Sequence, residues 1–258
     1  MAKQIDIQNV KNVLSIMGNS NEKKELKKTQ VFNVVILDRS GSMECIRQAA
    51  VEGFNETLAG IKKAQERFAD TQEHYVSLVT FCSCETRLVF DKTPVQEARP
   101  LTLEDYVPCC TTPLYDAMGF TLTSMQVYIK NIEDAVVVVT IITDGLENAS
   151  REYSGKAIKN LVERLRGEGW TFTYMGANQD AGKVAESLSI RNARNFAYSA
   201  VGTVNSMKKD SSTRMNFFTR LSRFKETESA DGIAPMSAEE RRNQYTAMAD
   251  EAFDEEEK

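Results

Sequence analysis

Three short segments, far apart in the sequence, carry oxygen-bearing side chains of the kind that bind hard metal ions. They are residues 38–42 (Asp-Arg-Ser-Gly-Ser), 111–116 (Thr-Thr-Pro-Leu-Tyr-Asp) and 143–145 (Thr-Asp-Gly). Together they offer two carboxylates and three hydroxyls, which belong to Asp38, Ser40, Ser42, Thr112 and Asp144. Magnesium prefers such oxygen ligands, with water molecules completing an octahedron. The set needs no histidine or cysteine, which disfavours zinc at this point.

Each segment lies at an expected junction between a strand and a helix. Residues 31–38 and 135–144 are apolar runs without alternation, typical of strands that are buried on both faces. Residues 44–68 and 113–129 have apolar side chains at helical spacing. In a doubly wound sheet, ligands bind outside the carboxyl ends of the strands, where the strand order switches. We therefore expect the three segments to meet at that edge of the sheet.

The remaining periodicity predicts an α/β fold: a doubly wound, mostly parallel, six-stranded sheet with helices on both faces. Further strands are expected at residues 74–82, 86–91, 170–176 and 193–198. The link between the first two of these strands is too short for a helix, so the second is expected to run antiparallel at an edge. Further helices are expected around residues 158–165, 180–188 and 217–224.

The chain divides into three parts by composition. Residues 1–30 form a polar extension with a short amphipathic helix, residues 31–225 form the α/β domain, and residues 226–258 form an acidic linker, a helix and a tail. Ser237 and Glu240 make a capping box, which predicts the start of that last helix. The terminal helices either cap the sheet or meet a partner.

Composition limits the classes of partner. The chain has 258 residues and a net charge of −5, and acidic and apolar residues dilute its basic clusters at residues 23–28 and 208–225. We interpret these clusters as solvated helix faces and expect no nucleic-acid partner. No apolar run approaches the ~20 residues that span a bilayer, so we expect no membrane partner. Five cysteines without a secretory signal favour a reduced, cytoplasmic location.

In this order, the three segments resemble the metal ion-dependent adhesion site (MIDAS) of the von Willebrand factor A (vWA) family. That site combines Asp-x-Ser-x-Ser with a distant Thr and a distant Asp-Gly, and the resemblance covers about Val31 to Ser199. It implies a vWA fold in which hydroxyls bind the metal directly and carboxylates bind it largely through water. The hydroxyls are those of Ser40, Ser42 and Thr112, and the carboxylates are those of Asp38 and Asp144. The stretches TPLYDA and TDGLENAS are also similar to bacterial cytoplasmic members of the family.

The resemblance also implies a function. Because few anionic groups touch the cation, it remains electrophilic and recruits an Asp or Glu side chain from a partner protein. The chain is then expected to be a Mg²⁺-dependent protein–protein interaction module rather than an enzyme, with Mn²⁺ or Ca²⁺ as alternative cations. Similar cytoplasmic proteins work beside ATPases, kinases or stress-response machinery, so the resemblance implies partners of those kinds.

The loop before the metal-binding threonine departs from the family pattern. Cys109, Cys110 and Thr111 stand where many members carry glycines. Both Thr111 and Thr112 therefore remain candidates for the ligand. We prefer Thr112 because it directly precedes the Pro-Leu-Tyr-Asp run. Asp116 either stiffens the site from behind the ligands or is a first-turn acid that the helix dipole favours.

Two enzyme classes compete with this interpretation. A Mg²⁺-dependent phosphohydrolase of the haloacid dehalogenase type would use Asp38 as its nucleophile, but it needs a second Asp where Ser40 stands. A nucleotide-binding enzyme would use the loop from Gly176 to Lys183. This loop resembles a phosphate-binding loop, but it has one residue too many and Val184 in place of the Mg²⁺-binding hydroxyl. In our interpretation, Asn178 of this loop lies at the rim of the cation site.

Four of the five cysteines fall in two close pairs. Cys82 and Cys84 end the second expected strand, and Cys109 and Cys110 lie in the loop before Thr112. Both pairs are expected on the same face of the domain as the cation. A zinc or redox role is an alternative, although neither Cys-x-Cys nor Cys-Cys has the usual zinc spacing. The default interpretation is thiols that are buried or lie in loops.

Overall fold

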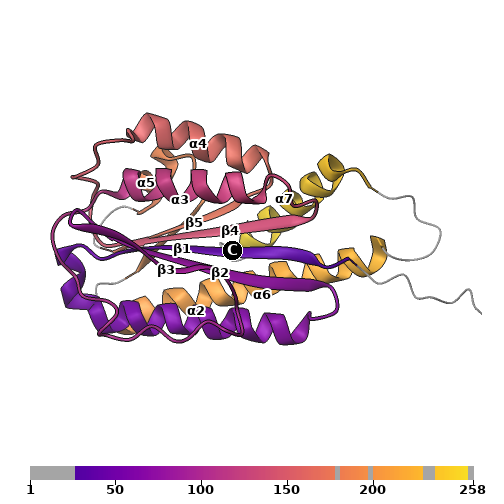
Figure 1. Cartoon of the computed structure of the whole chain (residues 1–258), viewed down its shortest axis with the longest axis horizontal. Coiled ribbons are helices and arrows are strands. Elements are labelled where there is room, and N and C mark those ends of the chain that lie inside the picture. Colours follow the sequence, from indigo (N-terminus) through magenta and orange to yellow (C-terminus); the bar gives the residue numbers. More distant parts are fainter. Residues whose placement is uncertain (1–26, 178–180, 197–199, 229–235, 255–258) are drawn as a thin grey trace, which may run out of the picture.

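The carboxyl ends of the parallel strands lie together at one end of a six-stranded sheet (Figure 1). The strand order in this computed structural model is β3-β2-β1-β4-β5-β6, and β1 pairs in parallel with both β2 and β4. The strand order therefore switches between β1 and β4, as expected. The strands are β1 (Thr29–Asp38), β2 (Gln72–Cys82), β3 (Glu85–Pro94), β4 (Ala135–Thr143), β5 (Thr171–Ala177) and β6 (Asn192–Phe196).

The structure describes residues 27–177, 181–196, 200–228 and 236–254. The helix expected in the N-terminal extension and the acidic end of the chain lie outside these residues, as does Asn178. Within the described part of the chain, no helix has the length and apolar character needed to span a membrane.

Helices cover both faces of the sheet, as predicted (Figure 1). One face carries α3 (Leu114–Ile129), α4 (Gly155–Gly167) and α5 (Ala181–Ser187). The other carries α2 (Arg47–Arg67), α6 (Ala200–Glu228) and α7 (Ala238–Asp254). A short 3-10 helix, η1 (Gly41–Ile46), leads from the end of β1 into α2.

The central strand β1 contributes to the apolar core on both faces. Phe32, Val34 and Ile36 pack on the α3 side, whereas Val35 and Leu37 pack on the α2 side. Successive side chains of a strand point to opposite faces, so a strand that is covered on both sides has no polar positions to alternate. This packing explains the continuous apolar run in the sequence.

An antiparallel edge strand completes the sheet, as predicted. β3 pairs antiparallel with β2, and Cys82 lies opposite Glu85 at the turn between them. Two residues, Ser83 and Cys84, form this turn, which leaves no room for a helical crossover. The turn lies at the same edge of the sheet as the end of β1, because β1 and β2 run in parallel.

The C-terminal helix α7 is part of the packed domain. Tyr245, Ala249 and Phe253 are buried in one core together with residues of β4 and α6. The hydroxyl of Tyr245 donates a 2.9 Å hydrogen bond to Oδ1 of Asp134, which precedes β4. Of the two roles considered for this helix, the structure shows that it caps the sheet.

The basic cluster on α6 is only in part a solvated helix face: Lys208, Lys209 and Arg223 are exposed, as expected, but Arg214 and Lys225 are buried. Arg214 is 2% exposed, and its Nε donates a 2.6 Å hydrogen bond to Oδ2 of Asp210. Its guanidinium also donates to Oδ1 of Asn33, a polar residue within β1. Lys225 is likewise buried and forms an ion pair with Asp134. The prediction was wrong for these two residues because Asn33 and Asp134 provide polar partners beneath this helix.

Candidate metal centre

Side chains of the first and third segments meet where β1 and β4 end. Ser42 Oγ donates a 2.6 Å hydrogen bond to Oδ1 of Asp144, although the two residues are 102 positions apart. The Oγ atoms of Ser40 and Ser42 lie 3.1 Å from each other. The parallel pairing of the two strands places Leu37 opposite Ile142, so the residues that follow each strand lie side by side.

Asp38 is the buried anchor of this group. Its Oδ1 accepts a 2.7 Å hydrogen bond from the backbone N–H of Ser40, and its Oδ2 accepts a 2.6 Å hydrogen bond from Thr143 Oγ1. The pKa of Asp38 is raised to about 6, chiefly by burial; the hydrogen bonds from Thr143 and Ser40 oppose the rise, and the nearby charge of Asp144 adds to it. A cation beside the two carboxylates would offset both unfavourable effects.

Thr112 completes the group from the second segment. It is 2% exposed, and a Cβ atom placed on Gly145 would lie 3.2 Å from its Oγ1 and 3.6 Å from Ser42 Oγ. The two hydroxyls therefore border one small space in front of Gly145. Asn148 fixes the threonine through both of its backbone groups: Asn148 Oδ1 accepts from Thr112 N at 2.9 Å, and Asn148 N donates to Thr112 O at 3.1 Å.

The neighbouring Thr111 makes different contacts. Its side chain is exposed, and its Oγ1 donates a 2.7 Å hydrogen bond to Ser83 Oγ in the β2–β3 turn. Ser83 N also donates to Thr111 O at 2.9 Å. Between the two candidate threonines, the geometry favours Thr112 as the residue that faces the site.

Backbone hydrogen bonds join the first segment to the loop before α3. Gly41 N donates to Cys110 O at 3.0 Å, and Cys109 N donates to Arg39 O at 2.9 Å. A Cβ atom on Gly41 would lie in van der Waals contact with Cys110 O, at 3.4 Å. The loop that carries Thr112 is therefore tied directly to the Asp-x-Ser-x-Ser turn.

Two acidic residues hold the loop that follows Asp144. Oxygens of Asp116 accept hydrogen bonds of 2.8–2.9 Å from the backbone N–H groups of residues 151–153. Glu147 accepts from the backbone N–H groups of Ser150 and Tyr115. This geometry supports the interpretation of Asp116 as a residue that stiffens the site. Glu147 was not singled out from the sequence, although the TDGLENAS stretch contains it.

Two further contacts were also missed by sequence reasoning. The fully buried hydroxyl of Tyr106 donates to the backbone carbonyl of Asp38, and Asn148 holds Thr112 as described above. Both residues lie in irregular segments, where periodicity carries no information. Only the tertiary arrangement reveals that they support the site.

The donor set fits a hard divalent cation. Two carboxylates and three hydroxyls converge at the carboxyl ends of neighbouring strands, and oxygen donors of this kind suit Mg²⁺ or Mn²⁺. Gly145 keeps the space between Thr112 and Ser42 clear of any side chain. The arrangement is therefore suited to binding an ion.

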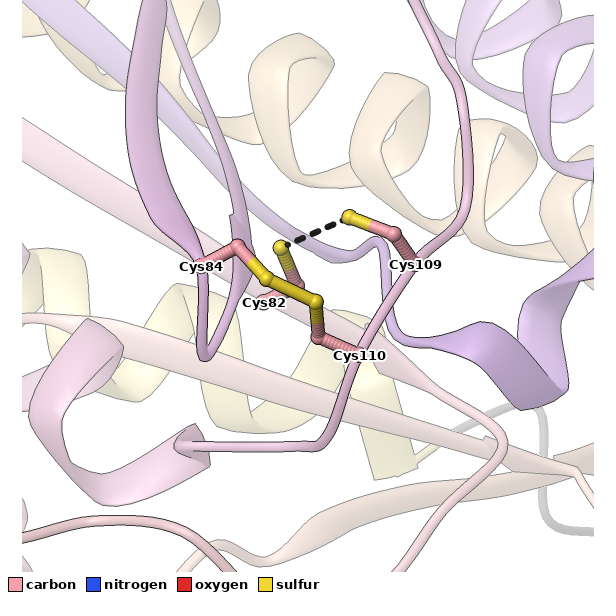
Figure 2. A group of neighbouring side chains, drawn as sticks. All are labelled: Cys82, Cys84, Cys109 and Cys110. Atoms are coloured by element: carbon pink, nitrogen blue, oxygen red, sulfur yellow. Dashed lines mark hydrogen bonds between the residues drawn. A yellow bond between two sulfur atoms is a disulfide. The ribbon is translucent and has the colours of Figure 1, made fainter.

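Four cysteines gather beside this centre (Figure 2). Cys84 and Cys110 form a disulfide, and the Sγ atoms of Cys82 and Cys109 are 3.2 Å apart. The expectation that these residues are unpaired thiols is therefore wrong for Cys84 and Cys110. The two residues meet because the β2–β3 turn packs against the loop before α3, a tertiary contact that sequence patterns do not reveal.

The chain also has one histidine, His74, and one loop that resembles a phosphate-binding loop. The loop from Gly176 to Lys183 begins in β5 and continues into α5. Residues 178–180, including Asn178, lie outside the described part of the chain, so the nucleotide-binding interpretation stays a prediction. His74 is 2% exposed, packs against the ring of Phe218, and has a pKa that burial lowers to about 3. These contacts indicate a structural histidine.

No family model and no curated protein matches the sequence. Solved structures do match. The pilus adhesin SpaC from Lactobacillus rhamnosus GG is 15% identical with a TM-score of 0.54, and the match covers 74% of this chain and 32% of SpaC. Proximal thread matrix protein 1 (PTMP1) from the mussel byssus, with a zinc-occupied MIDAS motif, is 13% identical with a TM-score of 0.50. That match covers 73% of this chain and 46% of PTMP1. The SpRpn10 VWA domain is 8% identical with a TM-score of 0.48, over 70% of this chain and 95% of that domain.

At these low sequence identities, the similarity to the solved structures shows only that the fold is shared. The chain spans about a third of the pilus adhesin and less than half of PTMP1. The six-stranded, mostly parallel α/β sheet with one antiparallel edge strand, expected from the sequence, is confirmed.

Proposed function

We propose that this chain is a non-catalytic interaction module that binds a carboxylate of a partner protein through one divalent cation, Mg²⁺. One observation carries the proposal: five oxygen-bearing side chains from three distant segments converge around Gly145 at the switch between β1 and β4. Ser40, Ser42 and Thr112 would bind the cation directly. Asp38 and Asp144 would bind it largely through water.

The balance of charge explains why a cation in this site would bind a carboxylate from outside. Neutral hydroxyls would supply the direct contacts, so the cation would keep most of its positive charge and attract an Asp or Glu from outside. The pair of carboxylates behind it would set its position. A carboxylate on a partner then gains a charge-assisted contact that no neutral side chain offers.

The matched structures support a metal-dependent interaction. One of them is a pilus adhesin, and PTMP1 has a zinc-occupied MIDAS motif. We therefore propose a divalent cation in general and Mg²⁺ in particular. We base the choice of Mg²⁺ on the all-oxygen donor set, with Mn²⁺ or Ca²⁺ as substitutes.

The environment of Asp38 supports a non-catalytic role. Its side chain is fully buried, and each of its oxygens accepts a short hydrogen bond. A carboxylate held in this way is poorly placed to attack phosphorus, as the phosphohydrolase hypothesis requires. Ser40, which stands where that class needs its acid–base Asp, instead lies beside Ser42.

The rim of the site offers an apolar contact for a protein. Leu146 is 63% exposed and follows directly after Gly145. A protein partner would bury this side chain while its carboxylate binds the cation, whereas a small anion would leave it exposed. We propose a cytoplasmic partner of this kind, in the setting of ATPases, kinases or stress-response machinery.

A pull-down from lysate tests the proposal. The full chain should capture a partner in Mg²⁺, lose it in EDTA, and release it when acetate or a glutamate-containing peptide competes for the cation. Asp38→Ala should capture none and Thr112→Val should capture less at limiting Mg²⁺, whereas Thr111→Val, the matched control at the neighbouring hydroxyl, should capture it as the wild type does. Equal capture in EDTA and Mg²⁺, or turnover of a phosphoester by the wild type but not by Asp38→Ala, would refute it.

A further inference from the structure

A second cluster of side chains that could bind a metal lies next to the candidate cation site. We call that first site, formed by Asp38, Ser40, Ser42, Thr112 and Asp144, the oxygen site. The Sγ atoms of Cys82, Cys84, Cys109 and Cys110 all lie within 4.8 Å of one another. Two of these residues come from the β2–β3 hairpin and two from the loop before α3, and Figure 2 shows all four side chains directed toward one point. A single disulfide requires only two cysteines, so it does not account for the convergence of four.

The backbone is shaped to aim neighbouring cysteines at the same point. Adjacent residues in an extended segment point to opposite sides, so Cys109 and Cys110 would ordinarily diverge. Cys110 has φ of 62°, a left-handed conformation that is uncommon for residues other than glycine. This turn brings both sulfur atoms to the cluster. Unusual backbone of this kind is found preferentially at ligand-binding sites.

We propose that these four cysteines, in their reduced state, bind one zinc ion. Tetrahedral zinc with four thiolates has Zn–S distances of ~2.3 Å, which places the sulfur atoms ~3.8 Å apart. The observed separations are close enough for small side-chain rotations to reach this geometry. Sulfur ligands select zinc, whereas the neighbouring oxygen site suits a hard cation, so the chain would hold two different ions side by side.

An arginine lies beside such a site, where its guanidinium also forms a 3.0 Å ion pair with Glu85. Zinc with four thiolates carries a net negative charge, and the charge of Arg39 acts on Cys109. Arg39 is 9% exposed, and its Nε is buried without a hydrogen-bond partner among the described residues. A thiolate is an acceptor for that N–H group, and hydrogen bonds from residues around the ligands commonly orient and tune metal sites.

The zinc-binding form follows from reduction of the Cys84–Cys110 disulfide. A dithiol reductant transfers two electrons and two protons: the S–S bond breaks, two cysteine thiols form, and the reductant closes its own disulfide. Zinc then displaces one proton from each thiol, and these protons pass to solvent. In the reverse step, a disulfide oxidant takes up two electrons from Cys84 and Cys110 and two protons from solvent and becomes a dithiol; the Cys84–Cys110 bond re-forms, two ligands are lost and the ion is released.

Zinc at this position would fix the loop that carries Thr112. The cluster joins the β2–β3 turn to residues 109–110, and Cys110 O already accepts a hydrogen bond from Gly41 N in the Asp-x-Ser-x-Ser turn. The proposal goes beyond the interaction module and does not depend on it, because the two sites use separate ligands.

Metal analysis of the full chain, purified with zinc and a non-thiol reductant under nitrogen, tests the proposal. We expect one zinc ion per chain in the wild type. Cobalt substitution should give the sulfur-to-cobalt charge-transfer band and intense visible bands of a tetrahedral thiolate site. Cys84→Ser and Cys109→Ser should lose both signals, and circular dichroism checks that each variant is folded. Cys45→Ser, at an exposed thiol outside the cluster, should keep both.

A variant of the oxygen site separates this proposal from the first. Asp144→Asn should abolish Mg²⁺ binding and leave the cobalt thiolate spectrum unchanged. No zinc in the reduced wild type, iron in its place, or cobalt bound without the sulfur charge-transfer band would overturn the zinc proposal. None of these results would affect the oxygen site, and loss of Mg²⁺ binding alone would leave the zinc site intact.

Discussion

Thr143 Oγ1, at the end of β4, donates a 2.6 Å hydrogen bond to Oδ2 of Asp38, at the end of β1. The contact joins two adjacent strands through residues 105 positions apart and holds a carboxylate where solvent does not reach it. Burial makes the charged form costly, which is why the pKa of Asp38 rises to about 6. The site therefore disfavours the charged form of Asp38, and a bound cation would offset this effect.

Asp38→Asn should stabilise the metal-free protein while abolishing its response to Mg²⁺. The folded state holds the Asp38 proton more tightly than the unfolded state, whose pKa is near 3.8. The stabilising contribution of this group is therefore fully present below that value and lost as pH rises through about 6. At neutral pH the neutral variant should be more stable in EDTA by about 3 kcal/mol at most.

Urea unfolding of both proteins in EDTA across this pH range measures the difference. The advantage of Asp38→Asn should grow with pH and vanish at low pH, and a difference that is independent of pH would contradict the assignment. Mg²⁺ should stabilise the wild type less as pH falls through about 6, because protons compete with the cation for Asp38.

Thr112→Val should weaken Mg²⁺ binding at least about tenfold, or ~1.4 kcal/mol, because it removes one hydroxyl and keeps the side-chain shape. Thr111→Val is the matched control, since that hydroxyl bonds to Ser83 instead. Calorimetric titration of each variant with Mg²⁺ checks this. Equal losses in the two variants would mean that the loop as a whole, rather than the Thr112 hydroxyl, determines affinity.

Gly145→Ala should also weaken the binding of Mg²⁺ by about tenfold, because its methyl group would enter the space beside Thr112 and Ser42. Gly167→Ala, at the end of α4, has no described atom within 4 Å of its new Cβ and serves as the control. Affinities from manganese relaxation measurements compare the two. Wild-type affinity in Gly145→Ala would show that the cation lies elsewhere.

Gly119→Ala should destabilise the fold by about 1–3 kcal/mol through overpacking. A Cβ at this position would lie 2.4 Å from the ring of Tyr153, which covers α3. Chemical unfolding of the single variant and of a Gly119→Ala, Tyr153→Ala pair measures the effect. In the pair, the alanine at 119 should add little further cost. If Gly119→Ala costs as much stability without the Tyr153 ring as with it, a clash with that ring is not the cause.

Much of the fold is readable from the sequence because β1 and β4 are buried on both faces. Their uninterrupted apolar runs, with Asp38 and Asp144 at the carboxyl ends, are sufficient to predict the strands and the edge where the site forms. The order of strands follows from the doubly wound arrangement. Asp38, Ser40, Ser42, Thr112 and Asp144 come together as this reasoning expects.

Other features depend on contacts that sequence periodicity does not record. Arg214 belongs to a basic cluster typical of a solvated face, yet it is buried because Asn33 and Asp210 provide partners. Tyr106 and Asn148 support the site from loops, where each position is set by the tertiary fold. The pairing of Cys84 with Cys110 is likewise decided by how two loops meet.

Titration of the EDTA-treated chain with Mn²⁺, followed by electron paramagnetic resonance, tests the central claim most directly. Five oxygens around Gly145 should bind one Mn²⁺ per chain, Mg²⁺ should displace it, and a Ser42→Ala, Thr112→Val variant with an unchanged circular dichroism spectrum should bind none. Binding that persists undiminished in that folded variant, or no binding in the wild type, would contradict the proposed cation site.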